Sequence, residues 1–333
     1  MGKSETVVRR VGLVAVCIAL SGVVWRAGDG ERRAGTWVAR AVAGFPRSLL
    51  AAPCFPSSEG QLGARFREQR GLAGGAAPRS MNVTLPAGVT VIRDIAYGSD
   101  PRHRFDVYLP PHPANAPVIF MVHGGGWRIG DKGVRNVVQN KLDHWTAKGC
   151  IFISVNNRLL PAAKPLEQEA DVARALDVAR QKASSWGGDP KKFILMGHSA
   201  GAHLVALLNA KAPAKTWIGT VMLDSAALDV PRLMEAPHFR LYDDAFGNDP
   251  RQWRAASPFH QLTARTPPVL AVCSSLRPDS CSQAARFVEK ANALGTRASV
   301  LEEPLTHEQI NETLGEANAY TSAVDAFVDS LIR

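Results

Sequence analysis

From Val89 onward the chain alternates between short apolar runs and helix-forming stretches, and this alternation restricts the fold more than any other feature. Five of the runs contain few polar residues, as expected for strands buried on both faces of a parallel sheet. They are Pro117–Val122, Cys150–Val155, Lys192–Met196, Trp217–Leu223 and Pro268–Cys273. Helix-forming stretches lie between them, so the sequence predicts a three-layer α/β sandwich.

The remaining strands and the clearest helices complete this pattern. Thr90–Tyr97 and Arg104–Leu109 alternate between apolar and polar residues, which is typical of antiparallel edge strands. Ala298–Leu301 is expected to form the last strand. Helices are predicted over Leu166–Ser184, Cys281–Leu294 and Ala319–Leu331. We therefore expect a mostly parallel sheet of eight strands.

One segment, Ala227–Thr266, breaks the alternation after the sixth strand. It is rich in proline, aspartate and aromatic residues. An insertion at this point lies above the carboxyl edge of the sheet, where ligands bind in such folds. We expect it to line a substrate pocket, although an irregular surface excursion would have the same composition.

The charge of the chain is concentrated at its beginning. Residues 1–80 contain twelve Lys and Arg against five Asp and Glu, which accounts for +7 of the net charge of +9. The rest is nearly neutral, and this argues against a basic nucleic-acid-binding domain. With 46% hydrophobic residues and no run of 18 uncharged apolar residues, the chain reads as globular and not as a multi-pass membrane protein.

The N-terminal segment has the composition of a targeting signal. Three basic residues precede the uncharged run Val11–Trp25, a pattern typical of a secretory signal or a short membrane anchor. We expect residues 1–27 to fill this role, residues 28–88 to form a disordered Gly/Ala/Arg/Pro-rich linker, and residues 89–333 to form the main domain. Export or membrane anchoring follows from this interpretation, whereas a tail without a targeting role would leave the protein cytoplasmic.

The pentapeptide Gly197-His198-Ser199-Ala200-Gly201 stands between a predicted strand and the helix-forming run Ala202–Ala210. In a strand–turn–helix setting, G-x-S-x-G places a serine hydroxyl on a sharp turn at the sheet edge. The glycines lack a Cβ, so the strand and the helix can approach the turn closely. Ser199 is therefore the predicted nucleophile.

A second glycine-rich motif, His123-Gly124-Gly125-Gly126-Trp127, follows the third predicted strand. Exposed backbone N–H groups in such a loop can stabilise the negative oxygen of a tetrahedral intermediate. We assign this role to Gly125, Gly126 and Ala200, and we assign Trp127 and His198 to the substrate-binding surface. A phosphate-binding loop is disfavoured because no Lys-Ser or Lys-Thr follows the glycines.

The base and the acid are found by their order along the chain. In folds of this kind the serine precedes an Asp or Glu, which precedes a histidine. His307 follows the eighth predicted strand and is the expected base. Asp279, in the loop after the seventh strand, is the expected acid that orients it; Asp224 and Asp229, after the sixth strand, are the alternatives.

Together these motifs resemble the α/β-hydrolase fold superfamily, in particular its carboxylesterase, hormone-sensitive-lipase-like and kynurenine-formamidase-like members. The resemblance covers roughly residues 90–332. It implies a serine hydrolase that cleaves a small-molecule carboxylic ester through an acyl-enzyme, with no cofactor, no metal and no nucleic-acid partner. An amidase or formamidase would use the same residues, and a non-catalytic hydrolase-like binding protein is the alternative from another class.

Two of the five cysteines, Cys273 and Cys281, bracket the loop that contains Asp279. In an oxidising compartment they can form a disulfide that holds this loop. The sequence equally allows two free thiols, because spacing alone does not give geometry. Neither the pairing nor the oligomeric state follows from the sequence.

Overall fold

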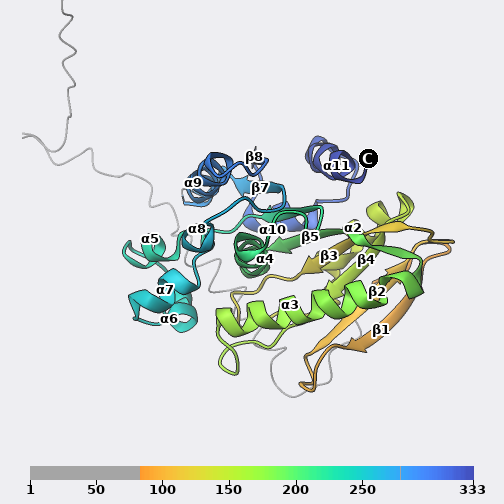
Figure 1. Ribbon diagram of the computed structural model, residues 1–333, viewed down its shortest axis with the longest axis horizontal. Coiled ribbons are helices and arrows are strands. Elements are labelled where there is room, and N and C mark those ends of the chain that lie inside the picture. Colours follow the sequence, from red (N-terminus) through yellow and green to blue (C-terminus); the bar gives the residue numbers. More distant parts are fainter. Residues whose placement is uncertain (1–82, 278) are drawn as a thin grey trace, which may run out of the picture. The chain divides into compact units, whose positions relative to one another are not determined.

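The computed structural model describes residues 83–277 and 279–333 (Figure 1). The predicted targeting segment, residues 1–27, and the linker as far as residue 82 lie outside the described residues. The described part contains one eight-stranded sheet with the strand order β1-β2-β4-β3-β5-β6-β7-β8. Its strands are β1 Thr90–Ala96, β2 Arg104–Leu109, β3 Ala116–Val122, β4 Ile151–Val155, β5 Gly188–His198, β6 Gly219–Leu223, β7 Val269–Ser274 and β8 Ala298–Glu303.

The pairing of the strands confirms the predicted sheet. The two alternating strands lie at one edge, where β1 pairs with β2 and β2 pairs with β4 in antiparallel orientation. Every other pair in the sheet is parallel. Residues of β4, β6 and β7 are buried throughout, as continuous apolar runs require when helices cover both faces of a sheet. The carboxyl ends of β3, β5, β6 and β7 therefore meet at one edge.

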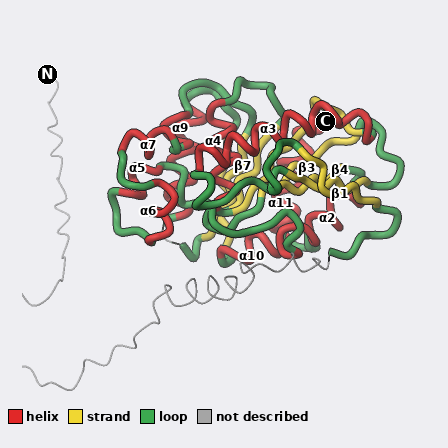
Figure 2. Tube along the Cα trace, turned by 90° about the horizontal axis from the view of Figure 1, so that it is seen from below, coloured by secondary structure: helices red, strands yellow, loops and turns green. Residues whose placement is uncertain are grey.

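Helices cover the two faces of the sheet, which Figure 2 shows as strands lying between helical layers. One hydrophobic cluster joins the sheet to α3, α4 and α9, and a second joins it to α2, α10 and α11. The bounds of these helices are α2 Arg135–Ala147, α3 Pro165–Lys182, α4 Ala200–Lys211, α9 Ser280–Ala293, α10 His307–Glu312 and α11 Ala319–Ile332. The sequence did not predict α2 and α10; α2 is polar on average, and α10 has only six residues.

The insertion after β6 consists of short helices. They are α5 Val230–Met234, α6 Arg240–Phe246, α7 Pro250–Ala255 and α8 Pro258–Gln261. Proline opens α7 and α8, where its missing N–H has no helical partner to lose. The side chains of Asp229 and Asp249 accept backbone N–H groups at the starts of α5 and α7. The segment is therefore ordered helix and not an irregular excursion.

The packed region begins before the predicted boundary at Val89. Thr84 exchanges two hydrogen bonds with the Gln139 side chain in α2, with N···O distances of 2.8 Å each. The last residues of the predicted linker therefore belong to the ordered domain. Among the helices of the described residues, none combines the length and the hydropathy that crossing a membrane requires.

A disulfide joins the end of β7 to the first turn of α9. The Sγ atoms of Cys273 and Cys281 are bonded at 2.04 Å, across a sequence separation of 8 residues. Of the two states that the sequence left open, the structure has the bridged one. The bridge closes the loop that runs from Ser274 to Ser280.

Replacing both bridged cysteines with serine is expected to lower the free energy of unfolding by roughly 2–3 kcal/mol, because the bridge removes loop-closure entropy from the unfolded chain. The measurement is chemical denaturation followed by tryptophan fluorescence. As a control, a reductant should destabilise the native protein by a similar amount and leave the double serine variant unaffected. An unchanged midpoint in both comparisons would contradict the expectation.

Candidate active site

Ser199 lies on a strained turn between β5 and α4. Its backbone has φ 55° and ψ −116°, a conformation that costs energy for a residue with a side chain. The turn is held at both ends, since the Ser199 N–H donates to the Leu223 carbonyl at 2.9 Å and the Ser199 carbonyl accepts from His203 N–H at 3.1 Å. The structure thus places Ser199 on the turn that the pentapeptide predicts.

The glycines around Ser199 are required by close backbone contacts. A Cβ on Gly197 would lie 2.4 Å from the Gly201 carbonyl oxygen, and a Cβ on Gly201 would lie 2.3 Å from the Val122 carbonyl oxygen. Both distances are far inside van der Waals contact. The turn is therefore packed directly against the end of β3, which brings the second glycine motif to the nucleophile.

That second motif forms a tight loop beside Ser199. A Cβ on Gly124 would lie 3.0 Å from the Ser199 Cβ. Gly125 has φ 115°, and its carbonyl accepts the N–H groups of Arg128 and Ile129 at 3.1 and 3.0 Å. Within the described residues, the N–H groups of Gly125, Gly126 and Ala200 donate no hydrogen bond, so these three donors have no partner in the structure.

His307, at the start of α10, contacts a carboxylate other than the one expected. Its Nδ1 lies 2.5 Å from Asp224 Oδ2, and Asp224 directly follows β6. The Asp224 side chain is fully buried, whereas His307 is 21% exposed. A neutral imidazole that donates Nδ1–H to Asp224 keeps a lone pair on Nε2, which is the atom a general base uses.

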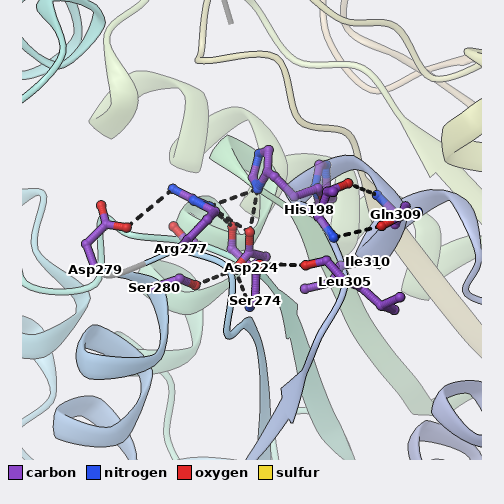
Figure 3. Close-up of polar contacts among 12 residues, drawn as sticks. His198, Asp224, Ser274, Arg277, Asp279, Ser280, Leu305, Gln309 and Ile310 are labelled. Atoms are coloured by element: carbon purple, nitrogen blue, oxygen red, sulfur yellow. Dashed lines mark hydrogen bonds and ion pairs between the residues drawn. The ribbon is translucent and has the colours of Figure 1, made fainter. Parts of the chain in front are cut away.

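The predicted acid, Asp279, does not contact His307, and this assignment needs correction. Its side chain is 45% exposed, and its nearest ionic partner is Arg277 Nη2 at 3.9 Å. In Figure 3, Arg277 lies between Asp279 and Asp224. Asp229, the other alternative, pairs instead with Arg286 at 3.2 Å. Asp279 and Asp229 both lie between Ser199 and His307 in the sequence, as Asp224 does. Of the three carboxylates, only Asp224 is aimed at the imidazole.

Four donors compensate the burial of Asp224. Oδ2 accepts from His307 and, at 2.6 Å, from Arg277 Nη1. Oδ1 accepts from the Ser274 N–H at 2.8 Å and from the Ser280 hydroxyl. Burial opposes ionisation, but the His307 hydrogen bond and the Arg277 guanidinium outweigh it and hold the pKa of Asp224 well below its usual range.

His198, which was predicted to contact substrate, contacts His307 in the structure. Its side chain is buried, its Nε2 lies 2.9 Å from the His307 carbonyl oxygen, and the two rings are 4.5 Å apart. Burial and the neighbouring His307 hold the pKa of His198 well below its usual value, so the ring is neutral and donates to that carbonyl. Because Ser199 follows His198 directly, this contact keeps His307 near the Ser199 turn. Within the described residues no hydrogen bond joins Ser199 to His307. Hydrogen bonds between catalytic groups often tighten only when substrate binds.

Trp127 was also predicted to bind substrate, but it is only 4% exposed. Its indole N–H donates to His203 Nδ1 at 3.2 Å, and its ring lies 5.1 Å from the ring of Phe246 and 5.9 Å from that of Tyr242. His203 Nε2 lies 2.7 Å from the Ala256 carbonyl oxygen. Trp127 thus joins the glycine-rich loop to the insertion.

Sequence reasoning missed Arg277 altogether, along with the two serines that bind Asp224. Arg277 stood in the predicted acid loop, and its charge beside a predicted carboxylate was the available signal. Asp224 had a stronger signal, because it directly follows a buried strand. Among the described residues, no group of three His, Cys, Asp or Glu side chains is arranged to hold a metal ion.

Parts of this chain are similar to known proteins. The family model BD-FAE matches residues 105–229. A probable isoprenylcysteine α-carbonyl methylesterase of Oryza sativa is 32% identical over 38% of this chain and 30% of its own length. The probable carboxylic ester hydrolase LipM of Mycobacterium tuberculosis is 28% identical over 69% of this chain and 58% of its own length. The chain thus spans less than two thirds of these relatives.

Solved structures share the fold over most of the described residues. Esterase B of Lactobacillus rhamnosis superposes with a TM-score of 0.64 at 19% identity, covering 82% of this chain and 92% of that one. Esterase 2 of Thermogutta terrifontis gives a TM-score of 0.61 at 20% identity, covering 78% and 97%. The described residues thus have the fold of these esterases, and residues 105–229 match the BD-FAE family model.

Proposed function

We propose that this protein hydrolyses carboxylic esters through an acyl-enzyme on Ser199. The observation that carries the proposal is the contact between His307 Nδ1 and the buried Asp224 carboxylate, beside the strained Ser199 turn. A carboxylate that fixes the tautomer of a histidine near an activated serine is the arrangement of a serine hydrolase. Asp224 takes the role for which Asp279 was predicted.

Acylation starts with the attack of the Ser199 hydroxyl on the acyl carbon. The hydroxyl proton passes to His307 Nε2, and Asp224 stabilises the resulting imidazolium through Nδ1–H. The negative oxygen of the tetrahedral intermediate accepts from the free N–H groups of Gly125, Gly126 and Ala200. When the intermediate collapses, the carbon–oxygen bond to the alcohol breaks, and His307 returns the proton to the leaving alcohol.

Deacylation repeats these steps with water. His307 takes a proton from water, the hydroxide oxygen attacks the acyl-enzyme, and the same three N–H groups bind the oxyanion. The bond to Ser199 Oγ then breaks, Oγ regains its proton from His307, and the carboxylic acid leaves. The machinery needs no charged substrate group, which suits a small uncharged ester as the substrate.

The names of the two curated relatives, a methylesterase and a carboxylic ester hydrolase, support an ester over an amide as the substrate. An amidase or formamidase would use the same serine, histidine and aspartate, so this alternative is decided by turnover. A non-catalytic binding protein is disfavoured because the base retains its carboxylate partner and the three N–H donors are free.

The acid assignment predicts opposite results for two matched variants. Asp224→Asn is expected to lower kcat for a short-chain aryl ester by roughly 10³–10⁴-fold, because the amide cannot hold His307 in the correct tautomer. Asp279→Asn, with its exposed side chain, is expected to stay within about twofold of the native rate. Steady-state kinetics of both variants and of Ser199→Ala test this.

Two results would contradict the assignment. If Asp279→Asn were the inactive variant, the acid would follow β7 and not β6. If Ser199→Ala kept its ester turnover, the serine mechanism itself would be wrong. Labelling by a fluorophosphonate probe, lost in Ser199→Ala and retained in the native protein, serves as the control for an intact site.

The preference for an ester over an amide is testable by direct comparison. The purified domain is expected to turn over a short-chain aryl ester with a kcat/KM at least about 100-fold higher than that for an N-formyl aryl amide, because an alcohol leaves more readily than an amine. A panel of acyl lengths from acetate to octanoate would then define the acyl site. Faster turnover of the formyl amide would establish the formamidase alternative.

We further propose that the enzyme is exported or anchored outside the cytoplasm. The disulfide between Cys273 and Cys281 supports this, since such bonds persist in oxidising compartments, and the basic and apolar beginning of the chain supports it independently. Fractionation of cells that express residues 1–333 should find the protein outside the cytoplasm with both thiols oxidised. Recovery in the cytoplasm with both thiols free would contradict this location.

A further inference from the structure

Arg277 places a permanent positive charge against both the base and its acid. Its Nη1 lies 2.6 Å from Asp224 Oδ2 and 2.9 Å from His307 Nδ1. The side chain is 24% exposed, so the interaction is only partly screened by solvent. The mechanism described above makes no use of this guanidinium.

The guanidinium and the imidazole share one carboxylate oxygen. Both the His307 Nδ1–H and an Arg277 N–H point to Asp224 Oδ2. The negative charge that would stabilise a protonated His307 is therefore partly neutralised by Arg277 before any proton arrives. The close Nη1···Nδ1 approach adds direct repulsion as soon as the imidazole becomes positive.

The position of Arg277 is built into the fold and is not that of a freely moving surface arginine. It lies in the loop that the disulfide between Cys273 and Cys281 closes. The residues at both ends of this loop, Ser274 and Ser280, bind the other oxygen of Asp224. The loop thus presents three donors to the same carboxylate, and Arg277 is the charged one.

On the basis of the proposed function, we infer that Arg277 is a positioning residue that extends the activity of the enzyme to lower pH. It acts through Asp224 and His307 by disfavouring the protonated imidazole, so that the base stays free in more acidic solution. A lower charge on Asp224 also weakens the stabilisation of the imidazolium in the transition state. The enzyme therefore exchanges some maximal rate for activity at acid pH.

Other ionisable groups lie on the elements of this region, but among the described residues none of them shares Asp224 Oδ2 with the imidazole as Arg277 does. They are His198 from β5, Tyr242 from α6, Lys141 from α2, Tyr320 from α11 and Glu308 beside His307 in α10. His198 is held neutral, and burial raises the pKa of Tyr242 to about 12. Burial lowers the pKa of Lys141 to about 7, but its Nζ binds the Asn311 carbonyl and not the imidazole. Its titration would appear in every Arg277 variant alike.

The test is the pH dependence of kcat/KM for three proteins: native, Arg277→Gln and Arg277→Lys. Glutamine keeps an N–H donor for Asp224 and removes the charge, and lysine keeps the charge. In Arg277→Gln, the pH of half-maximal kcat/KM on the acid side is expected to rise by about one unit. In Arg277→Lys it is expected to stay within about 0.3 units of the native value, so that the charge alone explains the shift.

The inference would be overturned if Arg277→Gln lowered kcat/KM equally at every pH and left the pH of half-maximal kcat/KM on the acid side unchanged. Arg277 would then only anchor the loop. Thermal denaturation of each variant shows whether it folds. If Arg277→Gln is unstable, the native enzyme is compared with Arg277→Lys alone. A shift of a full unit in the pH of half-maximal kcat/KM on the acid side of Arg277→Lys would contradict a role of the charge.

A second readout separates this inference from the proposed function. The rate at which a fluorophosphonate labels Ser199 depends on the same base but needs no ester turnover. In Arg277→Gln, the pH at which this labelling rate is half-maximal on the acid side is expected to rise as the corresponding pH for kcat/KM does. Labelling of Ser199 without hydrolysis of any ester would defeat the proposed function, whereas an unshifted labelling profile would defeat only the role of Arg277.

Discussion

The buried carboxylate of Asp224 is the constraint on which the site depends. Removing an ionised carboxylate from water costs several kcal/mol unless donors replace its hydration shell. The fold supplies four, from α10, from the end of β7, from the loop after it and from the first residue of α9. A histidine that donates to such a carboxylate has one tautomer available, and this fixes which of its nitrogens can act as a base.

The need to supply the Asp224 carboxylate with hydrogen-bond donors explains features that lie far apart in the sequence. Asp224 itself has φ 55°, a strained conformation for a non-glycine residue, so it turns sharply as it leaves β6. The loop from Ser274 to Ser280 must fold back over this carboxylate, and the disulfide holds the ends of the loop together. Ser199 is strained in the same way one strand away. Both conformations follow the ends of parallel strands whose last residues are buried, and this burial holds them in place.

The sheet and the sharp turn at Ser199 could be predicted because their signals are local. An apolar run of five or six residues is enough to indicate a buried strand, and the Gly197 to Gly201 pentapeptide encodes its own turn through the missing Cβ atoms. The helix α2 lacked such a signal. It is polar on average, and only its buried side, which includes Trp145 and Leu142, faces the sheet. Its place in the fold depends on partners far away in the chain.

The carboxylate partner of His307 could not be chosen from the sequence because chain order and sheet position admit both Asp224 and Asp279. Strands β6 and β7 are neighbours and parallel, so Asp224 and the loop of Asp279 emerge at the same edge and both precede His307. What separates them is the direction of one side chain. Asp224 turns inward onto the imidazole, while Arg277 occupies the space between Asp279 and the site (Figure 3). A carboxylate at Asp279 therefore meets a guanidinium before it can reach the base, and the arginine becomes part of the site in its place.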